Sequence, residues 1–322
     1  MHYDVFNGDA DGICALIQLR LAQPLESSLV TGIKRDIQLL DKVTVNPGDS
    51  LTVLDISFEK NSHRVAEFLK SGASIFYVDH HQCGDIPNHP NLKTLIDTDS
   101  AVCTSLLVNQ HLDGKFPLWA VTAAYGDNLN DSAENLAATL SVSGIGLEAL
   151  KNLGIYINYN GYGGSMADLH FAPDNLYKEM VRYRSPFDFI SDNHATFEKL
   201  ENGYKEDMAN AENIKPEYQS DAVAVFILPD LAWARRVSGV FGNHLANLNP
   251  AKAHAVLSYN KEGGYLISVR APLNNKVGAD AFCSGFATGG GRKSAAGINH
   301  LPKDQLSEFI GKFDVFYSAG MD

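Results

Sequence analysis

The stretch YVDHHQCG, residues 77–84, joins a strand-like segment to a cluster of polar side chains. Residues 74–78 have the apolar character of a short buried β-strand, and Asp79, His80 and His81 follow directly. Because neighbouring residues of a strand point to opposite sides, one packing role cannot serve all three side chains. The sequence therefore predicts a functional group at the tip of a strand.

Strand-like and helix-like segments alternate on both sides of this stretch. Strands are predicted at residues 3–6, 29–32, 51–55 and 74–78, and helices at 12–22, 36–43, 63–70 and 101–110. Such alternation is typical of βαβ units in a parallel sheet that is covered on both faces. Ligands of these sheets bind outside the carboxyl ends of the strands.

The remainder of the chain indicates a second α/β unit. Residues 118–153 are helical in pattern, YINYNGYGGS at 156–165 is typical of a loop, and 174–214 is polar and helix-prone. Strands follow at 222–228, 253–258 and 265–270, with a helix at 232–248 and a glycine-rich turn at 286–297. We expect an α/β protein with a doubly wound, mainly parallel N-terminal sheet, a smaller C-terminal α/β domain and an active site in the cleft between them. The expected boundaries are 1–155 for a catalytic domain, 156–217 for a connecting segment and 218–322 for a substrate-binding domain.

Composition restricts the function classes. The chain has 322 residues, of which 45% are hydrophobic and 20% charged, as in globular proteins of about two domains. The net charge of −12 argues against binding long nucleic acid over the whole surface, but not against a local pocket for a small phosphorylated ligand. Neither a signal-peptide pattern nor a membrane-length apolar run is evident, and the four cysteines are widely spaced, so we expect a cytoplasmic protein without a membrane partner.

Carboxylates end several other predicted elements. Asp9 and Asp11 follow the first strand, Asp55 ends the LTVLD strand, and Asp127 follows a helix. Taken singly, an aspartate at such a turn is often only a helix N-cap or a loop residue. Gathered at one edge of a sheet, the carboxylates would repel one another unless cations held them together. Carboxylates with imidazole suit borderline divalent ions, and two ions sharing a bridging carboxylate would clamp a phosphoryl group and activate a water molecule.

In this order, the motifs resemble those of the DHH phosphoesterase superfamily, which includes RecJ exonucleases, nanoRNases and dinucleotide phosphodiesterases. The resemblance spans nearly the whole chain: DADG at 9–12 matches the first motif, Asp55 the second, DHH at 79–81 the third and Asp127 the fourth. It implies hydrolysis by a metal-bound hydroxide, with two divalent cations, Mn²⁺ foremost and Mg²⁺ or Zn²⁺ as alternatives. The implied metal ligands are Asp9, Asp11, Asp55, His80, Asp127 and Asn7. The implied catalytic residues are Asp55, which bridges the ions, His81, which faces the substrate phosphate, and Asp79, which orients an imidazole.

The C-terminal part resembles the DHH-associated domain, which carries a GGGH-type loop and a phosphate-binding arginine at the end of a strand. The substrate-binding residues that this resemblance implies are Arg270, Gly290, Gly291, Arg292 and Lys293. The alternative for the glycines is a turn that tightens a sheet. Lys34 and Arg35 follow a strand end and either reach a phosphate or begin a solvated helix, and Tyr159 and Tyr162 either stack on a base or pack in their loop.

Two residues depart from the family pattern. Asn7 stands where RecJ-like members have an aspartate, and nanoRNase-like members have an upstream histidine; a neutral amide is a poorer ligand and predicts a weaker metal site. Arg292 replaces the histidine of the GGGH loop, and because arginine keeps its proton it is expected to be a charge clamp. A general-acid role would then fall to His81 or a metal-bound water.

The sequence thus favours a metal-dependent phosphoesterase that acts on short oligonucleotides, dinucleotides or small nucleotides, in the manner of nanoRNases. The alternatives are a RecJ-like single-strand exonuclease and a nucleotide-binding protein whose hydrolytic site has decayed at Asn7 and Arg292. The expected partner is a short nucleic acid or nucleotide, and a homodimer is left open.

Overall fold

The computed structural model describes residues 1–319 and divides the chain into two compact units. The first comprises Met1–Gly161 and Leu169–Asn202, and the second comprises Tyr162–Asp168 and the chain from Gly203 onward. The stretch 156–217, expected as a connection, therefore belongs partly to one unit and partly to the other. In the described part of the chain, every helix is too short or too polar to cross a lipid bilayer.

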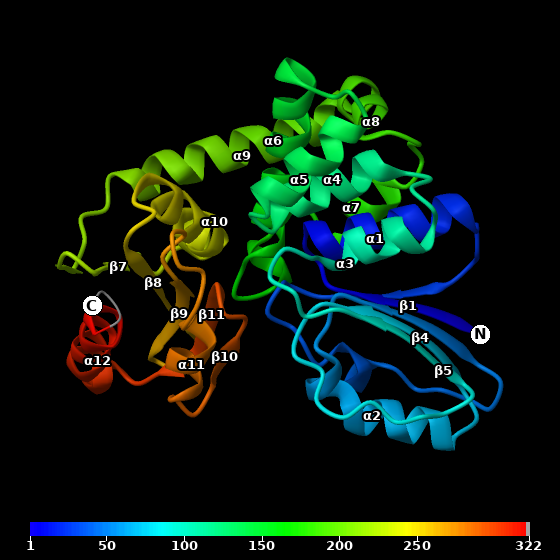
Figure 1. Ribbon diagram of the computed structural model, residues 1–322, viewed down its shortest axis with the longest axis horizontal. Helices are drawn as coiled ribbons and strands as arrows, with labels where there is room; N and C mark the ends of the chain where they lie inside the picture. The colour runs from blue at the N-terminus through cyan, green and yellow to red at the C-terminus, as the bar shows by residue number, and fades with distance from the viewer. Residues whose placement is uncertain (320–322) are drawn as a thin grey trace. The chain divides into compact units, whose positions relative to one another are not determined.

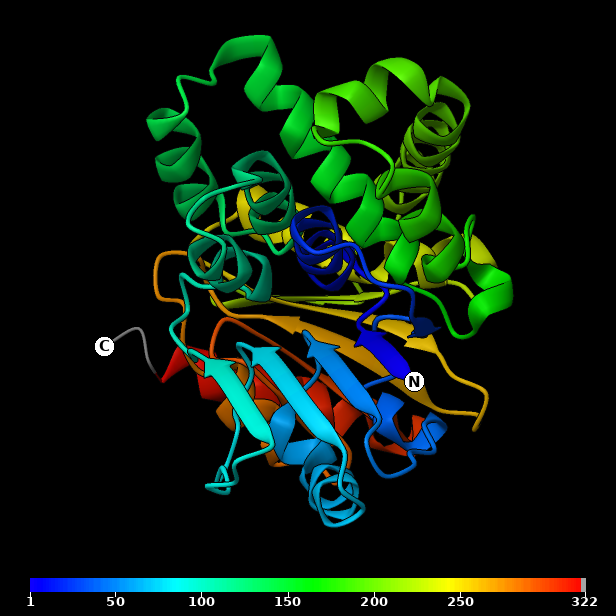
Figure 2. The same cartoon turned by 90° about the vertical axis from the view of Figure 1, so that its right-hand side faces the viewer.

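A five-stranded parallel sheet forms the centre of the first unit, as the alternating pattern predicted. Its strands are β1 (His2–Phe6), β2 (Ser28–Val30), β3 (Ser50–Leu54), β4 (Ser74–Asp79) and β5 (Leu92–Ile96), in the order β2-β1-β3-β4-β5. Figure 2 shows the blue and cyan arrows of these strands pointing the same way. The edge strand β5 was not predicted, because it is only half-buried and lacks a continuous apolar run.

Helices cover both faces of this sheet (Figures 1 and 2). On one face lie α2 (Phe58–Lys70) and the 3₁₀ turn η1 (Leu39–Lys42), which is all that forms of the helix expected at 36–43. A buried apolar cluster that includes Val53, Phe58 and Tyr77 packs on this side. On the other face lie α1 (Ala10–Ala22) and α3 (Thr104–His111), and α1 is buried along almost its whole length. The doubly wound arrangement of the first unit is therefore confirmed.

The other helices of the chain up to residue 212 follow one another closely. They are α4 (Pro117–Gly126), α5 (Asn130–Thr139), α6 (Gly144–Gly161), η2 (Met166–Asp168), α7 (Pro173–Met180), α8 (Pro186–Asp192) and α9 (His194–Glu212). Most belong to the first unit, whereas η2 lies in the second and α9 contributes residues to both.

The loop expected at 156–165 was wrong in its first half, because α6 continues to Gly161. Two glycines of α6 serve close packing: a Cβ atom would lie 2.0 Å from the carbonyl oxygen of Thr122 in α4 at Gly154, and 3.0 Å from the carbonyl oxygen of Gly8 at Gly161. Tyr159 is fully buried, and its hydroxyl hydrogen-bonds with Nε2 of His170 at 2.8 Å. No ring face of Tyr159 is left on which a base could stack.

The second unit contains a six-stranded mixed sheet. Its strands are β6 (Tyr218–Gln219), β7 (Val223–Ile227), β8 (Ala253–Tyr259), β9 (Tyr265–Arg270), β10 (Gly289–Gly291) and β11 (Ala295–Leu301), in the order β10-β11-β9-β8-β7-β6. Only β7 and β8 pair in parallel. The helices of this unit are α10 (Ala232–Leu248), α11 (Ala279–Ser284), η3 (Lys303–Gln305) and α12 (Leu306–Ser318). Aromatic rings such as Phe282, Phe309 and Phe313 fill its core.

The glycine-rich segment forms strand β10 and not an open turn. Gly291 has φ +146°, and a Cβ atom there would lie 2.5 Å from Cα of Ala296 on β11. A Cβ atom at Gly289 would lie 1.7 Å from the carbonyl oxygen of Cys283. Close backbone packing therefore accounts for these two glycines, whereas at Gly290 a Cβ atom would meet nothing within 4 Å.

Candidate metal centre

Two of the carboxylates are fixed by helix N-termini in the first unit. Asp9 is the N-cap of α1, and its Oδ1 accepts hydrogen bonds from the backbone N–H groups of Asp11 and Gly12 at 3.0 and 3.1 Å. The two oxygens of Asp11 accept the N–H groups of Ser105 and Thr104, at 2.7 Å each, in the first turn of α3. Asp9 is thus the N-cap that an ordinary interpretation allows, whereas Asp11 lies within α1 and accepts the first N–H groups of α3 from a neighbouring helix. These hydrogen bonds hold both side chains in place.

Asp55 sits immediately beyond β3 in a left-handed conformation, with φ +59°. This region is uncommon outside glycine, and aspartate and asparagine tolerate it best. The Asp55 N–H group donates to the Val78 carbonyl at 3.0 Å, and its Oδ1 accepts a hydrogen bond from Oγ1 of Thr104 at 3.3 Å. The turn therefore aims the Asp55 carboxylate toward the N-terminus of α3.

His80 is the common neighbour of the carboxylates. Its Nδ1 lies 2.7 Å from the carbonyl oxygen of Val102, and because a carbonyl only accepts, Nδ1 must donate. Its Nε2 lies 3.3 Å from Oδ1 of Asp55, 3.6 Å from Oδ2 of Asp127 and 3.8 Å from Oδ2 of Asp11. In the neutral ring, a nitrogen lone pair would face three carboxylate oxygens. Only a cation or a proton between them makes that arrangement favourable.

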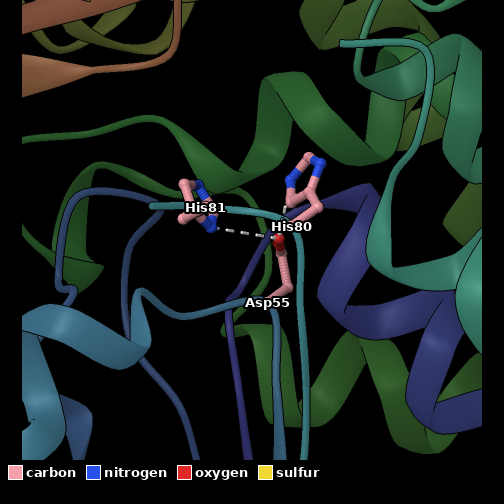
Figure 3. Close-up of side chains that lie close together, drawn as sticks. All are labelled: Asp55, His80 and His81. Atoms are coloured by element: carbon pink, nitrogen blue, oxygen red, sulfur yellow. Dashed lines mark ion pairs between the residues drawn. The ribbon is translucent and has the colours of Figure 1, made fainter. Parts of the chain in front are cut away.

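Asp79 orients His81. Oδ1 of Asp79 lies 2.7 Å from Nδ1 of His81, while its Oδ2 accepts the backbone N–H of Phe58 at 3.1 Å. Figure 3 shows His80 and His81 on either side of the Asp55 carboxylate, and the two imidazoles meet edge to face with centroids 4.7 Å apart. Because Nδ1 of His81 is engaged by Asp79, its Nε2 is the atom that remains to face a ligand, and the side chain is 30% exposed.

Burial and mutual repulsion perturb the carboxylates. Desolvation, with the charges of Asp127 and Asp9, raises the pKa of Asp11 to about 6. Desolvation, followed by the charges of Asp9, Asp11 and Asp127, raises the pKa of Asp55 well above its ordinary value. Among residues 1–319, the side chains that could hold a metal ion form two groups, Asp55 with His80 and His81, and Asp11 with His80 and Asp127. Buried anions around an imidazole fit a divalent cation, which would relieve their repulsion.

We predict that divalent metal stabilises the protein more at high pH than at low pH. A carboxylate whose pKa is raised on folding binds its proton more tightly in the folded state, so metal-free stability falls as pH rises from about 4 to about 6 through Asp11, and further through Asp55. A bound cation replaces those protons. The gain in melting temperature on adding Mn²⁺ should therefore grow between about pH 5 and about pH 8. A gain that is equal at both pH values would contradict this arrangement of charges.

Asn7 and Lys34 lie against the same cluster. The sequence predicts that Lys34 either reaches a phosphate or begins a solvated helix, but its ammonium group contacts the oxygens of Asp9 and Asp127, the latter at 3.3 Å, and Oδ1 of Asn158 at 2.8 Å. Nδ2 of Asn7 donates to the backbone carbonyl of Lys34 at 3.2 Å, and its Oδ1 is buried without a hydrogen-bond partner in the described chain. Arg35 is half-buried on the segment that follows.

Several contacts of the centre had no signal in the sequence. Val102, Thr104 and Asn158 contribute a carbonyl, a hydroxyl and an amide, and none belongs to a recognisable motif. Only the topology of the first unit brings α3 and α6 to the ends of β3 and β4. The only indirect indication of these contacts in the sequence was the presence of polar residues at the start of a helix that lies close to the end of a strand.

The predicted substrate-binding residues of the second unit lie at one end of β9 and in the β10–β11 turn. Arg270 ends β9, and its guanidinium donates to Oδ1 of Asn243 at 2.5 Å and to the Gly239 carbonyl at 3.1 Å, both on α10. Arg292 and Ala295 close the turn with N–H···O bonds of 2.8 and 3.2 Å, leaving Arg292 half-buried and Lys293 exposed. α10 thus fixes the direction of the Arg270 side chain.

Comparison with known proteins identifies the fold. No protein-family model and no curated protein matches the chain. Among solved structures, RecJ in complex with Mn²⁺ from Thermus thermophilus matches with a TM-score of 0.63 at 14% identity, over 99% of this chain and 52% of that one. A pGpG-specific phosphodiesterase, PggH from Vibrio cholerae, matches with a TM-score of 0.59 at 14% identity, over 99% of both chains.

A third match is the DHH domain of a protein described as a member of a family of ribosomal proteins, with a TM-score of 0.61 at 12% identity over 97% of this chain and 85% of that one. The sequence pattern predicted this same architecture, with DHH at residues 79–81 at the end of β4. The chain therefore has the fold of the DHH-domain proteins.

Proposed function

We propose that this protein is a divalent-metal-dependent phosphoesterase that hydrolyses short oligonucleotides, dinucleotides or small nucleotides. The observation that carries the proposal is the environment of His80, whose Nε2 faces oxygens of Asp11, Asp55 and Asp127 while Nδ1 is fixed by Val102. Without a cation to balance it, this buried concentration of negative charge only destabilises the fold, which argues against a centre that has lost its metal. We propose Mn²⁺ as the native ion, which the manganese-bound RecJ neighbour supports.

A divalent ion at this centre supplies charge stabilisation for a phosphoryl group and acidifies a water molecule. The chain's own residues would orient the substrate phosphate and donate or accept protons. His81 presents Nε2 to the substrate phosphate, either as a hydrogen-bond donor or as the source of a proton for the leaving oxygen. Asp79 fixes the ring orientation and stabilises the charged form of His81 when it arises.

A short substrate is favoured over a long strand. The net charge of −12 disfavours extended contact with a polyanion. The chain aligns with PggH over 99% of both proteins, whereas it spans about half the length of Thermus RecJ. The four free cysteines, three of them buried, support a cytoplasmic setting in which thiols stay reduced.

A hydrolysis panel tests the proposal. The purified protein with Mn²⁺ would be given a linear dinucleotide, a cyclic dinucleotide, a nucleoside bisphosphate and a long single strand, each with an EDTA control. We expect metal-dependent cleavage of at least one short substrate with a higher kcat/KM than for the strand. A strand cut faster than every short substrate favours the exonuclease alternative, and no cleavage of any substrate contradicts the proposal.

Arg292→Ala should selectively lower kcat/KM for short substrates. Arg292 is proposed to contact a substrate phosphate, and losing a charge-assisted hydrogen bond costs ~1.5–3 kcal/mol, or about ten- to a hundredfold in kcat/KM. Mn²⁺ affinity should not change, because a guanidinium is positively charged and offers no lone pair to a metal ion. Lys261→Ala, which removes an exposed positive charge from the turn between β8 and β9, is the matched control. An unaffected dinucleotide would mean that the glycine-rich hairpin is only structural.

A further inference from the structure

Lys34 places a positive charge inside the acidic cluster. Its Nζ pairs with Asp9 and Asp127, and Oδ1 of Asn158 on α6 supplies a third oxygen at 2.8 Å. Only 20% of the Lys34 side chain is exposed, and the side chains of Asp9, Asp127 and Asn158 are all buried. The ammonium group thus has the oxygen partners that a bound metal ion would otherwise take.

The hydrogen bonds of Asp9 separate it from the metal ligands. Oδ1 caps α1 and Oδ2 pairs with the Lys34 ammonium, whereas the two oxygens of Asp11 accept only neutral backbone N–H groups, each of which leaves a second lone pair for a metal. Asp9 belongs to neither group of the described residues that could hold a metal. Asp127 divides its oxygens: Oδ1 faces Lys34, and Oδ2 faces Nε2 of His80.

The two possible metal groups describe a single centre. Both contain His80, and its one available lone pair, on Nε2, binds one ion. The oxygens around that nitrogen belong to Asp11, Asp55 and Asp127. One imidazole nitrogen with three carboxylates is a complete protein ligand set for one borderline divalent ion.

Asn7 holds the backbone of Lys34 in position. Its Nδ2–H donates to the Lys34 backbone carbonyl, which fixes the segment that carries the lysine. An aspartate at position 7 would instead place a second acceptor against that carbonyl. The residue that departs from the RecJ-like pattern is therefore the one that secures Lys34 in the cluster.

We propose that this protein binds one divalent ion, between Asp11, Asp55, His80 and Asp127, and that the Lys34 ammonium takes the place of the expected second ion. The inference rests on the metal centre of the proposed function. Lys34 is then a resident cation that neutralises Asp9 and Asp127. Two substitutions, at positions 7 and 34, should be enough to restore a second metal site.

Manganese stoichiometry tests this directly. Metal-free protein would be titrated with Mn²⁺ by calorimetry, and the bound metal counted by elemental analysis and inspected by electron paramagnetic resonance, where neighbouring ions show spin coupling. The variants are Lys34→Met, Lys34→Arg and the double variant Asn7→Asp with Lys34→Met. Lys42→Met, which removes a half-exposed lysine paired with Asp36, is the matched control. Circular dichroism confirms that each variant is folded in the presence of metal.

We expect one Mn²⁺ per chain, without spin coupling, in the wild type, Lys34→Arg and Lys42→Met. Lys34→Met should gain a weak second ion, and the double variant a tighter, spin-coupled pair. Two ions in the wild type would overturn this inference while leaving the phosphoesterase proposal intact. A double variant that still binds one ion would also overturn it. If the wild type binds no Mn²⁺ at any concentration, the metal centre of the proposed function itself fails.

Discussion

Asp55→Asn is expected to reduce phosphoester hydrolysis by about a thousandfold or more while the chain remains folded. The substitution removes a negative charge beside Nε2 of His80 and leaves an amide, which is a poor metal ligand. Folding should survive because asparagine tolerates the left-handed backbone at this position, where φ is +59°. Turnover of the best substrate would be measured at saturating Mn²⁺. Near-normal turnover would remove Asp55 from the active centre.

The same variant carries a stability signature. Burial and the neighbouring carboxylates raise the pKa of Asp55 well above normal, so its ionised form destabilises the metal-free protein at neutral and higher pH. Asp55→Asn should therefore raise the melting temperature of the metal-free protein at about pH 8 and reduce the gain on adding Mn²⁺. Asp41→Asn, which neutralises a half-exposed aspartate of the same unit, is the control. Equal Mn²⁺ stabilisation of Asp55→Asn and wild type would contradict the assignment.

Asp79→Asn is expected to reduce kcat by about a hundredfold or more with little change in metal affinity. Asp79 uses one oxygen for the Phe58 N–H and the other for Nδ1 of His81. Asparagine has a single acceptor oxygen, and when this serves Phe58 the amide N–H₂ group faces His81. The proton of His81 then moves from Nδ1 to Nε2, and the ring loses the carboxylate that stabilises its charged form.

Nitrogen-15 NMR of the histidine rings separates this effect from a general loss of structure. The wild-type spectrum should show His81 protonated at Nδ1, and Asp79→Asn should show it protonated at Nε2. Asp85→Asn, at an exposed position six residues further along the chain, should leave both the tautomer and kcat unchanged. An Asp79→Asn variant with the wild-type tautomer and full activity would mean that Asp79 has only a structural role.

The sequence alone was sufficient to predict the architecture of the first unit and to predict that its motifs lie close together. Strands that alternate with helices determine a parallel sheet, and in such a sheet Asp55 and His80 must emerge at the same edge. The order of the four motifs made the fold predictable even though the three solved structures described above share at most 14% identity with the chain. The pattern at β4 was informative because one short segment contains both a buried strand and the polar residues 79–81 of the candidate metal centre.

Contacts between distant segments were not predictable in the same way. The position of Lys34 depends on where β2 leads the chain relative to α4 and α6. Nothing in TGIKRD, residues 31–36, distinguishes a lysine that reaches a substrate phosphate from one that pairs with buried aspartates. Glycine-rich composition was misleading twice. Gly161 ends α6 and packs against the backbone of Gly8 and Asp9, and Gly289–Gly291 form a strand packed against α11 and β11, although the sequence predicted a loop and a turn for these two segments. Composition indicates close backbone approach without saying which partner approaches.

The central claim is that a metal centre lies at the carboxyl ends of the strands of the first sheet, where residues 79–81 lie at the end of β4. Anomalous diffraction from crystals grown with Mn²⁺ is its most direct test. We expect an anomalous peak at bonding distance from Nε2 of His80 and from oxygens of Asp11, Asp55 and Asp127. The hydrogen bond of His80 to Val102 fixes the imidazole in the orientation that the ion requires. A peak elsewhere, or none at this cluster at saturating Mn²⁺, would contradict it.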